Sequence, residues 1–151
     1  MKSKNSNIKM DKLTPSLATE TEALREVYAA INRNDIPAAL KIFDPQIEWI
    51  EFEGFPSAGV YRGHAEVKVH LSQGRETWAE GSCEPERFIV AGDKIIVFLY
   101  VRVRLKNKLE WIEGRLADVF TFRNGKVIQM RTFAERQQAL EWAGVKASDT
   151  N

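Results

Sequence analysis

An aspartate in the second half of the chain stands out because it lies on an apolar face of its predicted strand. A two-residue turn at Asn107-Lys108 fixes the register of a long hairpin and places Val97 opposite Asp118. The other side chains predicted on that face are apolar: Ile95, Leu99, Val101, Val103, Ile112, Leu116 and Phe120. Because burial of an unpaired carboxylate costs several kcal/mol, Asp118 needs either a function or a partner.

Two explanations of Asp118 remain open on the sequence alone. In the first, Asp118 lines a pocket, its pKa is raised, and it donates a hydrogen bond or transfers a proton. In the second, it is half of a structural ion pair, because counting through the Asn124-Gly125 turn places Arg131 opposite it. A β-bulge in either strand would shift that count by one residue.

A second acid, Glu51, shares a strand face with Ile47 and Trp49. Its position on that face is compatible with a role in proton transfer. The alternative is a solvated acid at the end of a strand, since the neighbouring Glu53 shows that acids are tolerated there. The two interpretations of Glu51 also remain open.

The other reactive side chains and the composition exclude several classes of protein. We interpret His64 and His70 as surface or capping residues and Cys83 as a small buried thiol, since their spacing matches no zinc or nucleophile pattern. The 22 Lys and Arg residues nearly balance the 21 Asp and Glu residues, which removes the broad attraction that nucleic-acid and anionic-membrane binders use. With no apolar segment long enough for a signal or a membrane span, we expect a cytoplasmic protein with no metal, cofactor, nucleic-acid or membrane partner.

The N-terminal half must supply helices that position these acids. The capping box formed by Thr19 and Glu22 predicts a first helix, whose buried stripe is Leu24, Val27, Tyr28 and Ile31. Asp35 caps a second, short helix that ends at Asp44-Pro45. A third helix follows the glycine-rich loop 54–63 and ends at Gly81.

The rest of the chain has the pattern of strands. A strand is predicted at 47–52, and further strands at 84–91, 94–106, 110–123 and 126–134, followed by a short helix at 135–144. Helices followed by a run of hairpins indicate an α+β fold, with helices packed on a curved antiparallel sheet. We expect a flexible leader at 1–18, a single domain at 19–144 and a tail at 145–151.

Three segments resemble the NTF2-like superfamily, and within it the SnoaL-like and ketosteroid isomerase branch. They are Val27 to Asp35, Ile47 to Glu51 and Asp118 to Val127, with Phe43 between the first two. The resemblance covers about residues 19–140. It implies a cone, also described as a cystatin-like α+β roll, in which a bent sheet wraps around helices and an apolar cavity opens at one end. It also implies a homodimer built on the outer face of the sheet.

The resemblance also implies roles for individual residues. Glu51 falls where ketosteroid isomerases have their general-base aspartate, and Asp118 falls on the protonated aspartic acid of their oxyanion hole. The position of the oxyanion-hole tyrosine is Val27 here, and Tyr28 points about 100° further around the helix.

These observations together predict a SnoaL-like small-molecule enzyme that transfers a proton next to a carbonyl, as an isomerase or a polyketide cyclase does. Glu51 is the expected base, Asp118 holds the enolate, and the expected substrate-binding residues are Trp49, Leu99, Leu116, Phe120 and Arg131. Two alternatives use Arg131 differently. One is a non-catalytic ligand-binding or dimerisation module in which Arg131 pairs with Asp118, and the other is water activation of the epoxide-hydrolase type.

A polar and aromatic face of the long hairpin predicts a dimer interface. That face is too aromatic and too long for ordinary exposed sheet, so we expect a homodimer through it. Its residues are Tyr100, Arg102, Arg104, Trp111, Glu113 and Arg115.

Overall fold

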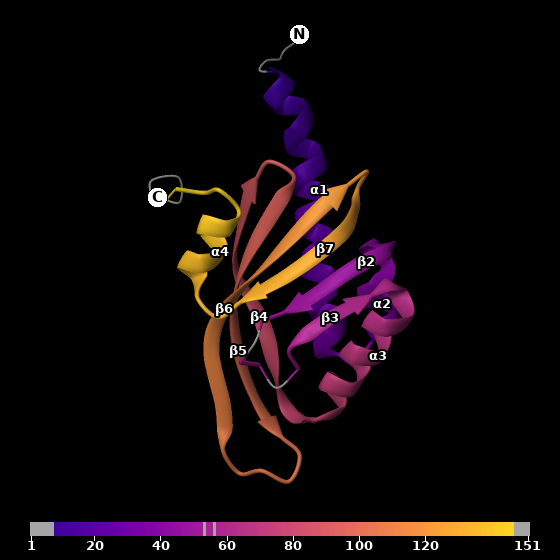
Figure 1. Ribbon diagram of the computed structural model, residues 1–151, viewed down its shortest axis with the longest axis vertical. Helices are drawn as coiled ribbons and strands as arrows, with labels where there is room; N and C mark the ends of the chain where they lie inside the picture. The colour runs from indigo at the N-terminus through magenta and orange to yellow at the C-terminus, as the bar shows by residue number, and fades with distance from the viewer. Residues whose placement is uncertain (1–7, 53, 56, 147–151) are drawn as a thin grey trace.

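The computed structural model describes residues 8–52, 54–55 and 57–146 (Figure 1). The helices are α1 (Ile8–Asn32), α2 (Ile36–Ala39), the 3-10 helix η1 (Leu40–Ile42), α3 (Gly63–Glu76) and α4 (Arg136–Trp142). The strands are β2 (Phe43–Glu51), β3 (Gly59–Arg62), β4 (Trp78–Ala91), β5 (Lys94–Leu105), β6 (Trp111–Arg123) and β7 (Lys126–Phe133). The fold is therefore of the expected α+β class.

The strands form one curved sheet in the order β3-β2-β7-β6-β5-β4. Neighbouring strands are antiparallel except β2 and β7, which are parallel, so the expected antiparallel sheet is corrected at this one junction. The long connection between β2 and β7, which includes α3 and four strands, gives the chain room to return in the same direction. Among the helices in the described ranges, none is long and apolar enough to cross a membrane.

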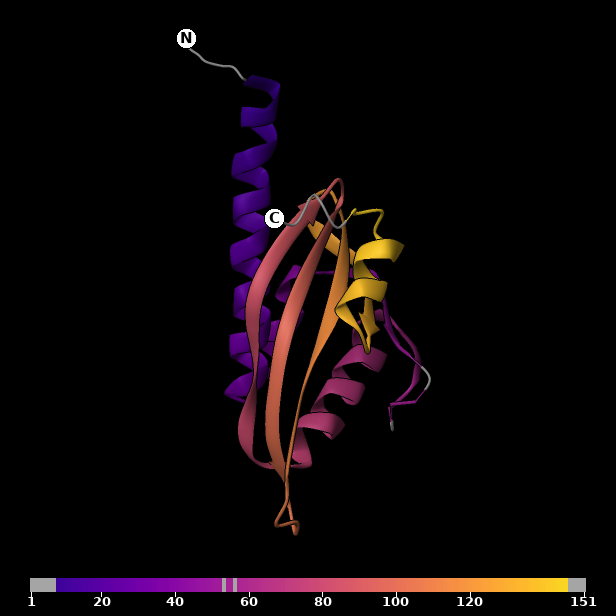
Figure 2. The ribbon, with the colours of Figure 1, turned by 90° about the vertical axis from the view of Figure 1, so that its left-hand side faces the viewer.

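The β5–β6 hairpin has the register predicted from the sequence. Val97 lies opposite Asp118, and Tyr100 lies opposite Arg115. Alternation along the two strands separates an inner face, which packs against α1 and α3, from an outer face covered in part by α4. Figure 2 shows α1 and α4 on opposite sides of these strands. Asp118 is therefore on the inner face, among the core residues of the domain.

The first helix is longer than the sequence analysis predicted. It begins at Ile8, so the capping box at Thr19 lies inside the helix and the expected flexible leader is helical from Ile8 on. The added turns contain the good helix formers Met10, Lys12, Leu13 and Leu17, and the helix also continues through Pro15, which the sequence favoured as part of a flexible leader. The ends of the expected leader and tail, 1–7 and 147–151, lie outside the described residues.

Two further boundaries differ because strands form where a helix end and a loop were predicted. α3 ends at Glu76, and Gly81 lies within β4 opposite Val103. Gly81 has a φ of +121°, and a Cβ there would lie 2.2 Å from the carbonyl oxygen of Arg102, so glycine marks a close approach of two strands and not a helix end. The predicted loop 54–63 contains the short strand β3, which pairs with β2.

The C-terminal end of α1 is bound to the free edge of β4. Nδ2 of Asn32 donates to the carbonyl oxygen of Cys83 at 3.0 Å, and the backbone N–H of Cys83 donates to Oδ1 of Asn32 at 2.9 Å. Arg75 of α3 donates to the carbonyl oxygens of Ile31 and Asn32 at the end of α1, and the Ile31 oxygen also accepts from the backbone N–H of Asn34. These bonds fix α1 one turn beyond Tyr28, and so they fix the position of that side chain.

Candidate functional site

Tyr28 and Asp118 meet in the inner core. Tyr28 projects from α1 and Asp118 from β6, and the Tyr28 hydroxyl lies 2.6 Å from Oδ2 of the aspartate. The two residues are 3% and 6% exposed, so this contact is buried. The resemblance placed Val27 at the tyrosine position and turned Tyr28 away from it. The curved sheet instead buries an arc of α1 that includes both residues, and Tyr28 reaches the aspartate.

Burial changes the acidity of this pair. It raises the pKa of Asp118 to about 6, while hydrogen bonds from Tyr28 and Thr132 oppose the rise. The negative charge of Glu51 raises the pKa of Asp118 further, so the two acids lie within electrostatic reach of each other. Burial, followed by the charge of Asp118, raises the pKa of Tyr28 well above its usual value. A carboxyl group that titrates near neutral pH is suited to proton transfer.

Arg131 does not pair with Asp118, which corrects the predicted ion pair. A register irregularity between Thr121 and Phe122 shifts the β6–β7 pairing by one residue, so Thr132 lies opposite Asp118. Arg131 lies opposite Val119 on the outer face, with its guanidinium carbon 5.0 Å from the centre of the Trp142 ring. In the described part of the chain, Asp118 forms no salt bridge.

Glu51, at the end of β2, is held by three donors. Nε1 of Trp49 donates to its Oε2 at 2.8 Å, and Nε2 of His70 lies 2.6 Å from the same oxygen. The Ser57 hydroxyl donates to Oε1. Burial by itself would raise the pKa of Glu51, but these hydrogen bonds outweigh it and leave the pKa below its usual value. Glu51 is therefore an ordered, ionised carboxylate and not a solvated strand end.

His70 belongs to this cluster, although the sequence analysis assigned it a surface or capping role. It projects from α3 one turn after the buried Val67, and its side chain is 10% exposed. Its ring stacks on Tyr61 of β3, with centroids 3.8 Å apart and 15° between the planes. Its spacing from the apolar Val67 could have predicted this burial, since residues three apart share a helix face. His64 is exposed as predicted, with Nε2 2.8 Å from the carbonyl oxygen of Phe43.

Four of the five predicted substrate-binding residues border the inner core. Trp49, Leu99 and Phe120 are buried in it, and Leu116 packs against it half-buried. The fifth, Arg131, lies on the other face. Cys83, predicted to be a small buried thiol, is half-buried against the inner core, and desolvation followed by the nearby charge of Asp118 raises its pKa. The inner core therefore brings two acids, a tyrosine and a histidine to one apolar region.

Two hollows on the surface lie away from these residues. One, of about 580 Å³, lies beside β2, β7 and the start of α3, and it includes Glu48, Arg62 and Arg123. The other, of about 550 Å³, lies between Phe52, Phe133 and Trp142. Neither is lined by Tyr28, Asp118 or Glu51, so neither is the apolar cavity that the resemblance implies.

Solved structures with the same fold include several small proteins. TerC, co-crystallised with polyporic acid, is 25% identical, with a TM-score of 0.69, and the match covers 82% of this chain and 97% of TerC. An NTF2-like protein from Burkholderia thailandensis is 26% identical, with a TM-score of 0.69 and coverage of 81% and 95%. One from Burkholderia xenovorans is 27% identical, with a TM-score of 0.64 and coverage of 82% and 94%.

No curated protein matches the sequence at a significant level. A family model does match. It describes the SnoaL-like domain and aligns with residues 24–130, which are most of the chain and run from the C-terminal part of α1 into β7. The structures with this fold include NTF2-like proteins and a protein with a ketosteroid isomerase-like fold. The chain therefore belongs to the SnoaL-like family of the NTF2-like superfamily.

Proposed function

We propose that this SnoaL-like protein is an enzyme that transfers a proton next to a carbonyl group of an apolar small molecule, as an isomerase or polyketide cyclase does. The observation that carries the proposal is the buried Tyr28–Asp118 pair, whose carboxyl group has a pKa of about 6. Removal of a proton beside a carbonyl puts negative charge on the carbonyl oxygen. A buried donor at that oxygen stabilises the enolate, and protonated Asp118, held by Tyr28, is such a donor.

The basic side of the proposed site is Glu51 with the bound His70. Their bond of 2.6 Å joins two residues of low exposure, and Glu51 lies within electrostatic reach of Asp118. A base and an acid in one apolar region are the two groups that an enolisation needs. The side chains proposed to surround the substrate are Trp49, Leu99, Leu116 and Phe120.

The comparison with TerC supports a small organic ligand. TerC was co-crystallised with polyporic acid, and it shares the fold over most of both chains at 25% identity. We assign to the present chain only the class of ligand, an apolar molecule with a carbonyl oxygen, because the inner core combines apolar side chains with the Tyr28–Asp118 pair.

The two alternatives from the sequence both depended on Arg131. A non-catalytic module was favoured by an Asp118–Arg131 ion pair, and water activation of the epoxide-hydrolase type placed Arg131 beside the carboxylates. Because Arg131 lies on the outer face against Trp142, the contact that favoured both alternatives is not formed. The non-catalytic module keeps one observation in its favour, since neither of the two surface hollows is lined by Tyr28, Asp118 or Glu51.

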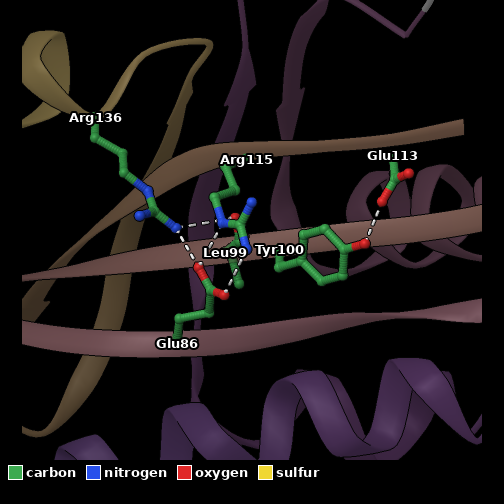
Figure 3. Close-up of polar contacts among 6 residues, drawn as sticks. All are labelled: Glu86, Leu99, Tyr100, Glu113, Arg115 and Arg136. Atoms are coloured by element: carbon green, nitrogen blue, oxygen red, sulfur yellow. Dashed lines mark hydrogen bonds and ion pairs between the residues drawn. The ribbon is translucent and has the colours of Figure 1, made fainter.

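The proposal includes a homodimer through the outer face of β5 and β6. The charged side chains on this face have contacts within the chain: Arg102 lies 3.9 Å from the centre of the Trp111 ring, and the Tyr100 hydroxyl donates to Glu113. Figure 3 shows two further cations, Arg115 of β6 and Arg136 of α4, converging on Glu86 of β4. A second copy can cover this face because its charged side chains already have contacts within the chain.

Deuterium exchange at carbon tests the proposed chemistry without the natural substrate. A panel of cyclic ketones headed by β-tetralone is incubated with the protein in heavy water, and NMR follows the loss of the C–H signals beside the carbonyl. We expect exchange faster than in buffer alone, and a rate at least about 100-fold lower for Asp118→Leu. Asp93→Asn, in the exposed β4–β5 turn, is the control and should match the wild type. Wild-type protein that exchanges no ketone faster than buffer contradicts the proposed function.

A further inference from the structure

Glu51 is poorly suited to accept the proton itself. Each of its donors, Trp49, Ser57 and His70, stabilises the ionised carboxylate. Protonation would disrupt this arrangement, and the pKa of Glu51 is accordingly below its usual value. A general base works best when its pKa lies near the operating pH. The contacts of Glu51 therefore fit a supporting residue better than a proton acceptor.

His70 has a ring nitrogen that is available to accept a proton. An ionised carboxylate can only accept hydrogen bonds, so Nε2 of His70 carries the hydrogen in the 2.6 Å contact with Glu51. The other ring nitrogen, Nδ1, then keeps its lone pair. Across residues 8–52, 54–55 and 57–146, no hydrogen bond to this nitrogen is formed.

Two contacts fix the plane and the rotation of the His70 ring. Tyr61 stacks on it with centroids 3.8 Å apart, and Glu51 holds its Nε2 edge. Tyr61 is itself held, since its hydroxyl donates to the carbonyl oxygen of Ser57 at 2.7 Å, and the Ser57 hydroxyl donates to Glu51. The loop that follows β2 therefore closes a ring of contacts around the imidazole. This is the order that a positioned base requires.

We propose that His70 is the catalytic base of this site and that Glu51 is its positioning residue, an inference that rests on the proton-transfer function proposed above. In the step, the C–H bond beside the carbonyl breaks, the proton moves to Nδ1 of His70, and the electron pair forms the enolate. Asp118 donates to the enolate oxygen, and Glu51 stabilises the imidazolium. Return of the proton from Nδ1 to another carbon completes an isomerisation in which nothing is oxidised or reduced.

Substitution of His70 is the first test. His70→Gln keeps a side-chain donor for Glu51, and thermal melts check that it is folded. We expect its ketone exchange to be at least about 100-fold slower than that of the wild type. The matched control is His64→Gln, since His64 is the other histidine of the chain and lies outside the site. A His70→Gln protein that exchanges at the wild-type rate overturns the assignment of His70 and leaves the proposed function standing.

Chemical rescue separates the two residues. His70→Ala leaves a gap for free imidazole, which should restore exchange by at least about 10-fold if an imidazole is the proton acceptor. The decisive protein is the double variant His70→Ala with Glu51→Gln. If Glu51 positions the ring and stabilises the imidazolium, added imidazole still rescues the double variant, but to a smaller extent than the single variant. Rescue of the single variant but not of the double variant would mean that Glu51 accepts the proton, and it would overturn the proposal.

The same measurements distinguish failure of the proposed proton-transfer function from failure of the assignment of His70 as its base. Absence of exchange by the wild-type protein across the ketone panel ends the proposed function and the assignment of His70 with it. Exchange by the wild type with unchanged exchange by His70→Gln ends only the assignment. Wild-type exchange, loss in His70→Gln and rescue of both alanine variants by imidazole support both.

Discussion

Asp118 and Glu86 are carboxylates on the same sheet, yet their surroundings push their acidities in opposite directions. On the inner face, burial raises the pKa of Asp118 to about 6, and its side-chain partner is the neutral hydroxyl of Tyr28. On the outer face, hydrogen bonds from Arg136 and Arg115 lower the pKa of Glu86 (Figure 3). The sheet thus separates a carboxyl group that can hold a proton near neutral pH from one that stays ionised.

The two regions also differ in the charge and the exposure of the groups that bind each carboxyl group. Glu86 accepts from Arg115 at 3.1 and 3.3 Å and from Arg136 at 2.6 Å, so loss of one donor leaves another. These contacts are exposed and are screened by salt. In the interior, Asp118 accepts from the neutral hydroxyls of Tyr28, at 2.6 Å, and Thr132, and all three residues are buried. Single substitutions should therefore have large effects inside the sheet and small effects outside it.

The largest expected effect is on catalysis at Asp118. Asp118→Leu removes the proposed donor for the enolate oxygen, and we expect ketone exchange to fall at least about 100-fold. Asp118→Asn still donates a hydrogen bond and should lose less. Because the acid form acts, the wild-type rate should decline as pH rises through about 6, the pKa of Asp118. Equal losses in the two variants, or an unchanged pH profile in Asp118→Asn, would remove Asp118 from the mechanism.

The second effect is on stability. The pKa of Asp118 is about 6 in the folded protein against 3.8 as a reference, so the folded state binds this proton more tightly than the unfolded state. Its contribution to stability is complete below about pH 4 and is lost as pH rises through about 6, a change of about 3 kcal/mol. Urea unfolding at several pH values should show this decline in the wild type.

Subtraction of the curve of Asp118→Asn isolates this contribution, because Glu51 and Glu86, whose pKa values are lowered, act in the opposite direction in both proteins. Adding Arg131→Met to Asp118→Asn should be additive, since the two residues lie on different faces. Two results would contradict the placement of Asp118 in the inner core, away from Arg131. One is that stability depends on pH in the same way in the wild type and in Asp118→Asn, and the other is that Arg131→Met restores the stability of Asp118→Asn.

The third prediction concerns assembly through the outer face. At micromolar concentration we expect sedimentation of a dimer, and Trp111→Glu should convert it to a monomer of 17.2 kDa. The physical reason is that the substitution removes the ring over which Arg102 lies and adds a carboxylate to a surface that has to be covered. A wild-type protein that sediments as a monomer refutes the predicted homodimer.

The smallest effect is expected at Glu86. Glu86→Gln should lower the melting temperature slightly in low salt, and the difference from wild type should disappear in high salt because the ion pairs are exposed. Glu110→Gln, at the exposed end of the hairpin, is the matched control. A large decrease that persists in high salt would show that the outer network is more than a screened surface feature.

The sequence predicted the β5–β6 register correctly but not the neighbouring one. Strict alternation and a turn predicted at Asn107-Lys108 leave one pairing that buries the apolar face, so Val97 opposite Asp118 was predictable. The two-residue turn itself was wrong, because β5 ends at Leu105, β6 begins at Trp111, and the backbone N–H of Lys108 donates to the carbonyl oxygen of Leu105. The register irregularity at Thr121 and Phe122 has no comparable signal, because no residue there needs a special backbone conformation. That single shift moved Arg131 to the outer face.

The contacts of Tyr28 and His70 required the tertiary structure. The curvature of the sheet decides how wide an arc of α1 is buried, and the strands of that sheet come much later in the chain. The sequence therefore does not show which of the neighbouring residues Val27 and Tyr28 contacts Asp118. His70 depends on β3, whose four residues are too few to show a strand pattern and begin with a glycine. Without β3, nothing places Tyr61 against the imidazole.

The amide of Asn32 has a consequence for how the chain behaves at high concentration. It binds both the N–H and the carbonyl oxygen of Cys83 in the middle of β4, the strand at one end of the sheet. An added strand from another molecule needs such groups to extend a hydrogen-bond ladder. At the other end, β3 offers only four residues, Gly59–Arg62. Both borders of the sheet therefore resist the edge-to-edge growth that leads to fibrils.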